Sequence, residues 1–395
     1  MLRYEKEQKS SVASLRQGGR FAPEQVADFN RNAWPISPEY PYPVLFGDIL
    51  LSGPETPGKQ VHIPTIGNTD LVFPQGSGFS IVGLCQKLCI VDDRITVGWA
   101  GRRFSAAIVV KLLMAQCAKR EFTLDDIMNF WENNVDKWHK DDLSLVGFVK
   151  HGNIVNWFGL NSFQFCSQQF GDVYVSGTGA QATHDFLETL VRQEYPPRVN
   201  ALEKAVATAL FASTHMIGNE LIRPEMLLNY FGGGAEIVSL VKGKFRKIGD
   251  ITYVFWYVKE NKDQTINFRL PKIALKFTYH EDFLLIRRVT FDEGANPLEL
   301  KCDDHRVDIV EPVHHSFDIS RVKDLPIPSF NSRWTCHFIL VEENTGSFSL
   351  RIVQRYTMNE DYEFYFVEEN GLISKLEMKE QFLRTLYSSV TKENF

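Results

Sequence analysis

The sequence has no strong excess of one charge and no long apolar run, and these two absences exclude two classes of protein. Its 43 lysines and arginines oppose 49 aspartates and glutamates, so a net charge of −6 provides no basic field to hold a nucleic-acid backbone. The longest apolar stretches, such as residues 106–114, are interrupted by Lys111 and fall short of the about 18 residues that cross a bilayer. We therefore predict no nucleic-acid partner and no membrane insertion.

The sequence is also poor in cysteine, which bears on its compartment and on metal binding. Six cysteines in 395 residues form no Cys-x-x-Cys pair, which argues against a disulfide scaffold. Cys85 and Cys89 flank a stretch that alternates like a strand, and no second pair follows at zinc-finger spacing. The first residues are mixed in charge and lack the apolar segment of a secretory signal. We expect a cytoplasmic protein with no cofactor and no metal.

Hydrophobic residues make up 44% of the chain, enough for a large core and for two or three domains. Residues 1–40 are polar and then proline-rich, which predicts an amino-terminal arm, and the closely spaced Pro35, Pro38, Pro41 and Pro43 exclude a regular central strand where they cluster. An apolar run follows at 44–51, and residues 52–80 have the Gly, Pro, Thr and Asn content of a long inserted loop. The main domain is therefore predicted over residues 41–260.

Apolar periodicity predicts the order of elements in this domain. Strand-like runs at 87–91 and 94–99 flank a tight turn, and a helical stripe runs from Ala106 to Cys117. A second helix begins at Thr123, whose spacing to Asp126 fits a capping box. Further strands and helices are predicted at 143–149, 154–160, 172–176, 180–193, 201–217, 236–241, 243–248 and 251–258. This alternation of strands and helix pairs favours an α+β fold, a four-layer αββα sandwich.

The remainder of the chain, residues 265–395, reads as a mostly β domain. Helical periodicity is absent until a short helix at about 379–386, and turns separate short strand-like runs. Metal-capable side chains occur at Cys302–His305, Asp308, His314 and His315. Their spacing matches no familiar metal site, so we interpret them as a solvated polar face.

A glycine motif near residue 180 allows a nucleotide-binding interpretation. Gly177, Gly179 and Ala182 lie between a predicted strand and a predicted helix, as in a dinucleotide fingerprint. A nucleotide fold would next supply a parallel strand with an acidic ribose ligand, whereas this chain continues with Tyr195, two prolines and another helix. A nucleotide-binding module is therefore the third and weakest hypothesis.

Several motifs together resemble the proteasome β-subunit and HslV type of N-terminal nucleophile (Ntn) hydrolase. Lys87, a hairpin, and Ala100-Gly101 at the head of a helix occur in the family's order and spacing. Gly177-Thr178-Gly179 looks like the family's Gly-Ser-Gly turn, and Phe46-Gly47-Asp48 looks like its early Ala-Ala-Asp strand. Residues 231–235 look like the Ser-Gly-Gly that opens a late strand. The resemblance covers about residues 40–260 and implies the same sandwich.

The resemblance also implies a set of catalytic groups. A terminal Thr, Ser or Cys would use its own α-amine as the base. Lys87 would lower the pKa of that hydroxyl or thiol, and Asp48 would hold the lysine in its charged form. The backbone N–H of Gly101 would bind the oxyanion, and Thr178 would take the place of the serine in the Gly-Ser-Gly turn. Each residue also has a structural interpretation, as a strand-edge lysine, a buried acceptor or a tight junction.

The nucleophile does not follow from the family spacing. Counting back from Asp48 leads to Asn32, and the only Ser, Thr or Cys between positions 21 and 47 is Ser37, which becomes the candidate nucleophile. The prolines after Ser37 oppose a regular strand there. The family's late acid and serine correspond to Asn229 and Gly232. Two groups that tune the terminal amine are thus replaced.

Two main functional hypotheses remain. In the first, the protein is a degenerate, catalytically silent member of the family, a pseudoenzyme that assembles with itself or binds a protein partner. In the second, it is an active Ntn peptidase or amidohydrolase that exposes its nucleophile by self-processing. Missing nucleophile and tuning groups favour the first hypothesis, because helper residues cannot replace a nucleophile.

Overall fold

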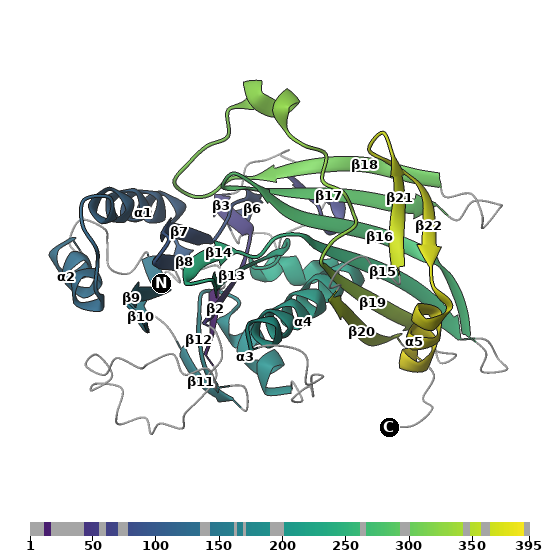
Figure 1. The fold of residues 1–395 in the computed structure, drawn as a ribbon, viewed down its shortest axis with the longest axis horizontal. Coiled ribbons are helices and arrows are strands. Elements are labelled where there is room, and N and C mark those ends of the chain that lie inside the picture. Colours follow the sequence, from purple (N-terminus) through teal and green to yellow (C-terminus); the bar gives the residue numbers. More distant parts are fainter. Residues whose placement is uncertain are drawn as a thin grey trace. The chain divides into compact units, whose positions relative to one another are not determined.

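The protein is a mixed α+β chain with several sheets, seen in a computed structural model (Figure 1). The structure describes residues 12–16, 43–54, 61–69, 78–134, 143–161, 164–168, 171–189, 201–260, 266–292, 301–342, 348–356 and 364–390. Two compact units are interleaved in sequence. The first draws on residues 1–212, 223–248 and 311–317, and the second on residues 213–222, 249–310 and 318–395.

The first unit contains two larger sheets whose neighbouring strands are all antiparallel. The six-stranded sheet has the order β11 (Gln164–Gln168), β12 (Gly171–Ser176), β1 (Val12–Arg16), β2 (Val44–Asp48), β13 (Ala235–Val241) and β14 (Lys244–Lys247). The four-stranded sheet has the order β10 (Ile154–Leu160), β9 (Leu143–His151), β8 (Ile95–Gly101) and β7 (Leu88–Asp92). An apolar cluster is shared by the two sheets and includes Leu45, Leu88, Ala100, Phe148 and Val238.

Two helices pack on the four-stranded sheet (Figure 1). Helix α1 (Arg103–Cys117) buries Ala106, Val109, Val110, Leu113 and Cys117, which confirms the stripe predicted from the sequence. Helix α2 (Leu124–Asn134) adds Ile127, Phe130 and Trp131 to the same core. The predicted capping box is also confirmed. The Thr123 N–H donates to Asp126 Oδ2 at 2.9 Å, and the Asp126 N–H donates to Thr123 Oγ1 at 3.3 Å.

The stretch predicted as a long inserted loop contains two small sheets. Strand β3 (Leu50–Pro54) pairs with β6 (Phe79–Leu84), and β4 (Val61–Ile63) pairs with β5 (Gly67–Thr69). The loop prediction was wrong for these residues because the stretch contains paired strands, and its Ile63 packs with Leu50, Ile81 and Leu227 in a small apolar core. The Gly, Pro, Thr and Asn residues between these short strands made the whole stretch look like a loop in the sequence.

The other helices of the chain lie after β12. Helix α3 (Ala180–Thr189) contacts β11 and β12, and α4 (Ala201–Ile222) passes from the first unit into the second. The 3₁₀ helix η5 (Pro224–Asn229) precedes β13. Of the helices in the described ranges, none has both the length and the apolar character to cross a bilayer.

The second unit is built on a six-stranded sheet. Its order is β18 (Lys301–Val310), β17 (Phe283–Asp292), β16 (Ile266–His280), β15 (Ile251–Glu260), β19 (Trp334–Glu342) and β20 (Phe348–Tyr356), with only β15 and β19 parallel. The hairpin of β21 (Phe364–Glu369) and β22 (Leu372–Met378) and helix α5 (Glu380–Val390) share an apolar core with this sheet. The 3₁₀ helix η6 (Ile319–Asp324) lies between β18 and β19.

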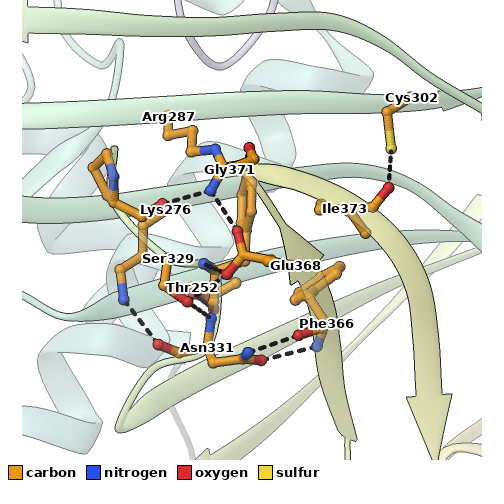
Figure 2. A network of polar contacts seen from close by, with 12 residues as sticks. Thr252, Lys276, Arg287, Cys302, Ser329, Asn331, Phe366, Glu368, Gly371 and Ile373 are labelled. Atoms are coloured by element: carbon orange, nitrogen blue, oxygen red, sulfur yellow. Dashed lines mark hydrogen bonds and ion pairs between the residues drawn. The ribbon is translucent and has the colours of Figure 1, made fainter. Parts of the chain in front are cut away.

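A buried arginine ties the β21–β22 hairpin to the sheet of the second unit (Figure 2). Arg287 of β17 is 1% exposed, and its guanidinium donates to Glu368 Oε1 at 2.5 Å and to the carbonyl oxygens of Pro328 and Gly371 at 2.6 Å. The same guanidinium lies over the Phe330 ring, 4.3 Å from its centroid. Burial lowers the pKa of Arg287 against the opposing effect of Glu368. This network fixes the hairpin by charge-assisted hydrogen bonds.

Candidate functional site

The structure brings Asp48 and Lys87 into one buried cluster in the first unit. Asp48 ends β2, and Lys87 directly precedes β7 in the other sheet. Asp48 is 0% exposed and Lys87 is 1% exposed. The Lys87 ammonium lies over the Trp99 ring, with Nζ 4.3 Å from the ring centroid, as in a cation–π contact. The lysine is therefore enclosed by an aromatic side chain of the neighbouring strand.

The Asp48 carboxylate is directed at the backbone. Its Oδ2 accepts from the N–H groups of Leu50 and Gly232, each at 3.1 Å. Gly232 has φ 118°, a conformation that favours glycine, and so its amide can turn toward the carboxylate. The other oxygen, Oδ1, is buried and has no hydrogen-bond partner. Burial raises the pKa of Asp48 to about 7, against the opposing charge of Lys87 and the two backbone hydrogen bonds.

Glu236 belongs to the same cluster, and the sequence analysis did not identify it. This residue of β13 is 1% exposed, and its Oε2 accepts from the N–H groups of Lys87 at 2.7 Å and Leu88 at 3.2 Å. The carboxylate thus joins the edge strand of one sheet to the core of the other. The sequence carried no distinguishing signal for this role, because an acid at the second position of the apolar strand Ala235–Val241 could equally face water.

A second lysine completes the cluster. Lys247 Nζ lies 3.7 Å from Glu236 Oε1 and donates to Gln86 Oε1. The carbonyl oxygen of Gln86 accepts from Trp99 Nε1 at 3.1 Å. Burial lowers the pKa of Lys87, whereas the charges of Asp48, Cys85 and Glu236 oppose that shift. Two acids and two lysines are therefore held between the sheets.

The predicted oxyanion residue lies on the strand next to Lys87. The Trp99 N–H donates to the Lys87 carbonyl at 3.0 Å, which puts these two residues side by side on β8 and at the start of β7. Gly101 ends β8, two residues beyond Trp99 and thus about 7 Å further along the strand. Its φ of 114° and its place just before α1 match a tight strand-to-helix junction.

Thr178 is bonded to the backbone two residues before Gly232, whose N–H donates to Asp48. It lies between β12 and α3, and its hydroxyl donates to the Tyr230 carbonyl at 3.2 Å. Strand β12 pairs antiparallel with β1 and β11, so Gly177 and Gly179 do not follow a strand of a parallel βαβ unit. A dinucleotide fingerprint requires that unit, which leaves the nucleotide hypothesis without structural support.

The amino-terminal part of the chain contributes one described strand. Ser37, the candidate nucleophile, and Asn32 lie outside the described residues. Within the segment predicted as an arm, β1 forms a central strand between β12 and β2, with Val12 opposite Gly47 and Leu15 opposite Val44. Strand β2, which ends at Asp48, therefore has this amino-terminal strand as a neighbour. Counting along the sequence missed this neighbour because residues 17–43 separate β1 from β2.

The residues that replace the family's late acid and serine have different roles here. Asn229 ends the 3₁₀ helix η5, and Gly232 donates its backbone N–H to Asp48. In the second unit, the Cys302 thiol contacts the Ile373 carbonyl at 3.7 Å, and the side chains of residues 303–305 lie outside the described set. Within the described residues, no group of three His, Cys, Asp or Glu side chains is placed to hold a metal ion.

The cluster can share protons among its members and can fix the two sheets together. The Asp48 carboxyl, with its pKa raised to about 7 by burial, changes protonation near neutral pH, and burial also lowers the pKa of the enclosed Lys87. Comparison of the chain with models of known protein families and with curated protein sequences found no match.

Proposed function

We propose that the protein is a catalytically silent relative of the proteasome β-subunit and HslV type of Ntn hydrolase. It is a pseudoenzyme that keeps the four-layer αββα sandwich and acts by assembling with itself or by binding a protein partner. Within this proposal the protein acts in the cytoplasm, as its sparse cysteines suggest.

The arrangement of helices and sheets in the first unit supports the sandwich. One apolar cluster joins the two sheets, and a second joins the four-stranded sheet to α1 and α2. Helix α3 contacts the six-stranded sheet through β11 and β12. Helices, two facing sheets and helices again are the layers that the motif order implies.

The burial of the Lys87 side chain is the main observation in favour of a catalytically silent protein. A lysine that activates a nucleophile has to place its ammonium beside the reacting hydroxyl, which must itself be open to substrate. Here the side chain is 1% exposed and its ammonium lies against the Trp99 ring. Asp48 Oδ2 accepts hydrogen bonds from the backbone N–H groups of Leu50 and Gly232. This enclosure supports a structural role for the cation and the acid.

Covalent labelling tests the silent function. We expect no adduct when the full chain is incubated with a β-lactone, an electrophile that acylates terminal Ser and Thr nucleophiles. The matched variants are Lys87→Met and Lys111→Met, the second at an exposed helical position. An adduct on the wild type that Lys87→Met removes and Lys111→Met retains would show an active nucleophile and contradict the proposal.

An active Ntn peptidase is the second candidate, and β1 favours it. Strand β1 lies beside β2, and its pairing with β2 advances toward Asp48 as the chain is followed back from Leu15 to Val12. The two residues that precede Val12 in the sequence are Ser10 and Ser11. A cut before either serine would free an α-amine next to a hydroxyl. A cut before Ser37 would do the same, but that serine is followed by prolines and not by a strand-like run.

Amino-terminal sequencing of the purified chain tests this second candidate. Processing that starts the mature chain at Ser10 or Ser11, and that a Ser10→Ala or Ser11→Ala change abolishes, would establish it. A chain that retains the residues before Ser10 contradicts it. The control is Ser37→Ala, which leaves processing intact if the cut lies before β1.

A further inference from the structure

A short segment between β18 and η6 packs into the first unit, although the chain on both sides of it belongs to the second. Residues 311–317 are part of the first unit, whereas Val310 and Asp318 are part of the second. Within this segment Pro312 is buried, and Val313 is 6% exposed in the apolar core that the four-stranded sheet shares with α1 and α2. These seven residues, here called the strap, are thus anchored in the first unit by apolar side chains.

The strap lies beside Gln86, the residue that precedes Lys87. The Gln86 N–H donates to the Glu311 carbonyl at 2.9 Å, and the two segments form an isolated parallel bridge at this point. The other polar groups of Gln86 face the charged cluster. Its carbonyl accepts from Trp99 Nε1 at 3.1 Å, and its side-chain oxygen accepts from Lys247 Nζ. Gln86 therefore connects the strap to the residues that enclose Lys87.

The side chain of Glu311 connects the strap to the start of α1. Its Oε2 lies 3.5 Å from Nη2 of Arg103, the first residue of α1, and its Oε1 accepts from the Phe317 N–H at 2.9 Å. Arg103 follows Gly101 by two residues. One strap residue therefore contacts the chain next to Lys87 with its backbone and the chain next to Gly101 with its carboxylate.

We propose that the strap is a releasable cover for the candidate site. It detaches from Gln86 and Arg103 while the two sheets stay folded, and its release opens the Lys87 ammonium to solvent and to ligands. The inference goes beyond the proposed function, because the strap covers Lys87 whether or not the chain carries a nucleophile.

The contacts of the strap suit local release. The side chains of Arg103 and Glu311 are 44% and 33% exposed, so water and salt screen their ion pair. Pro312 and Val313 hold the strap by burial, whereas β7, β8 and β9 are joined by antiparallel ladders. A segment held by few buried apolar side chains opens at a lower free energy than the sheet beneath it. Both ends of the strap stay attached to the chain, so it closes again without diffusing away.

The rate at which N-ethylmaleimide labels Cys85 tests the inference. Cys85 precedes Gln86, is 0% exposed and shares the apolar core of Val313, so release of the strap should expose its thiol. Cys89 is also 0% exposed but lies inside β7, so it reports on unfolding of the sheet. The full chain is labelled without denaturant, and peptide mass spectrometry gives the rate at each cysteine.

Two variants loosen the strap by different means. Val313→Ala should raise the rate at Cys85 at least about tenfold, because it removes the buried anchor. Glu311→Gln should raise it about two- to fivefold, as should high salt acting on the wild type, because each weakens a partly exposed ion pair. The rate at Cys89 should change by less than about twofold in every case. The matched controls, Val322→Ala and Glu281→Gln at exposed positions of the second unit, should leave both rates unchanged.

Hydrogen exchange gives an independent measurement of the same opening. Release frees the Gln86 N–H, whereas the Trp99 N–H keeps its bond to the Lys87 carbonyl, so Val313→Ala should speed exchange at Gln86 and not at Trp99. Equal acceleration at Cys85 and Cys89, or no acceleration at Cys85 in either strap variant, overturns the inference. That result leaves the catalytically silent assignment in place if the chain takes no β-lactone label. A labelled chain with selective release at Cys85 would contradict the silent function and keep the strap.

Discussion

Replacing Asp48 by asparagine should change how the stability of the protein depends on pH. Burial raises the pKa of this carboxyl from 3.8 to about 7, so the folded state holds a proton that the unfolded state has released. For an acid with a raised pKa, the stabilisation is complete below the unfolded pKa and is lost as pH rises through the folded value. The shift of about 3 units corresponds to about 4 kcal/mol across the whole window, and about 3 kcal/mol of it falls between pH 5 and 8.

The wild type should therefore lose about 3 kcal/mol relative to Asp48→Asn between pH 5 and 8. The side-chain oxygen of asparagine can still accept from the N–H groups of Leu50 and Gly232, so the comparison isolates the charge. Urea unfolding at several pH values, monitored by tryptophan fluorescence, measures the free energy of unfolding of both proteins. The comparison uses the unfolding transition whose midpoint differs between them. Asp125→Asn, at an exposed helical site, is the matched control substitution.

The result that refutes this reasoning is a stability difference between the wild type and Asp48→Asn that does not change between pH 5 and 8. An unchanged difference would mean that Asp48 is already ionised in the folded state at pH 5, as it would be if it were paired with Lys87. The description of Asp48 as an enclosed, poorly solvated carboxyl would then be wrong.

Three further substitutions test the packing and the buried charges. Gly218→Ala in α4 should destabilise the protein by about 3 kcal/mol, because the new Cβ would lie 1.6 Å from Cε2 of Phe338, whereas Gly83→Ala, with nothing within 4 Å, should change stability by under about 1 kcal/mol. Equal melting temperatures of the two variants would contradict the packing of α4. Arg287→Met should cost about 3 to 5 kcal/mol in urea unfolding, since it strands buried acceptors, and a loss under about 1 kcal/mol would show the network to be open to water. Glu236→Gln should cost about 1 to 3 kcal/mol in the same assay, and an unchanged midpoint would deny its role in joining the two sheets.

Local patterns predicted the elements whose partners are close in sequence. The stripe from Ala106 to Cys117 identified the buried side of α1, and the Thr123–Asp126 spacing identified the start of α2. Both signals depend on helical geometry alone, which repeats every 3.6 residues whatever the rest of the chain does. They needed no knowledge of tertiary contacts.

Elements with distant partners were harder to predict. Strand β1 is five residues long and its partners are β2 and β12, both far along the chain, so its polar surroundings suggested an arm. Helix α4 is one continuous pattern in the sequence, yet it passes from one compact unit into the other. Pairing and unit boundaries depend on long-range contacts that short windows of sequence do not record.

The candidate site shows the same division. Asp48 and Lys87 were identified through their motifs, and the structure brings both into one buried cluster, whereas their catalytic role stays a prediction. Glu236 and Lys247 were missed because a single charged residue in a strand looks the same in sequence whether it faces water or a buried backbone amide. Burial, and with it the shifted pKa of Asp48, follows only from the packing of two sheets.

The mass of the purified full-length chain tests the catalytically silent fold most directly. Intact-mass spectrometry after prolonged incubation at neutral pH should give the mass of all 395 residues, with or without Met1. A shorter chain that begins with Ser, Thr or Cys would contradict the proposal, because such a cut produces the free nucleophile that the silent fold is held to lack.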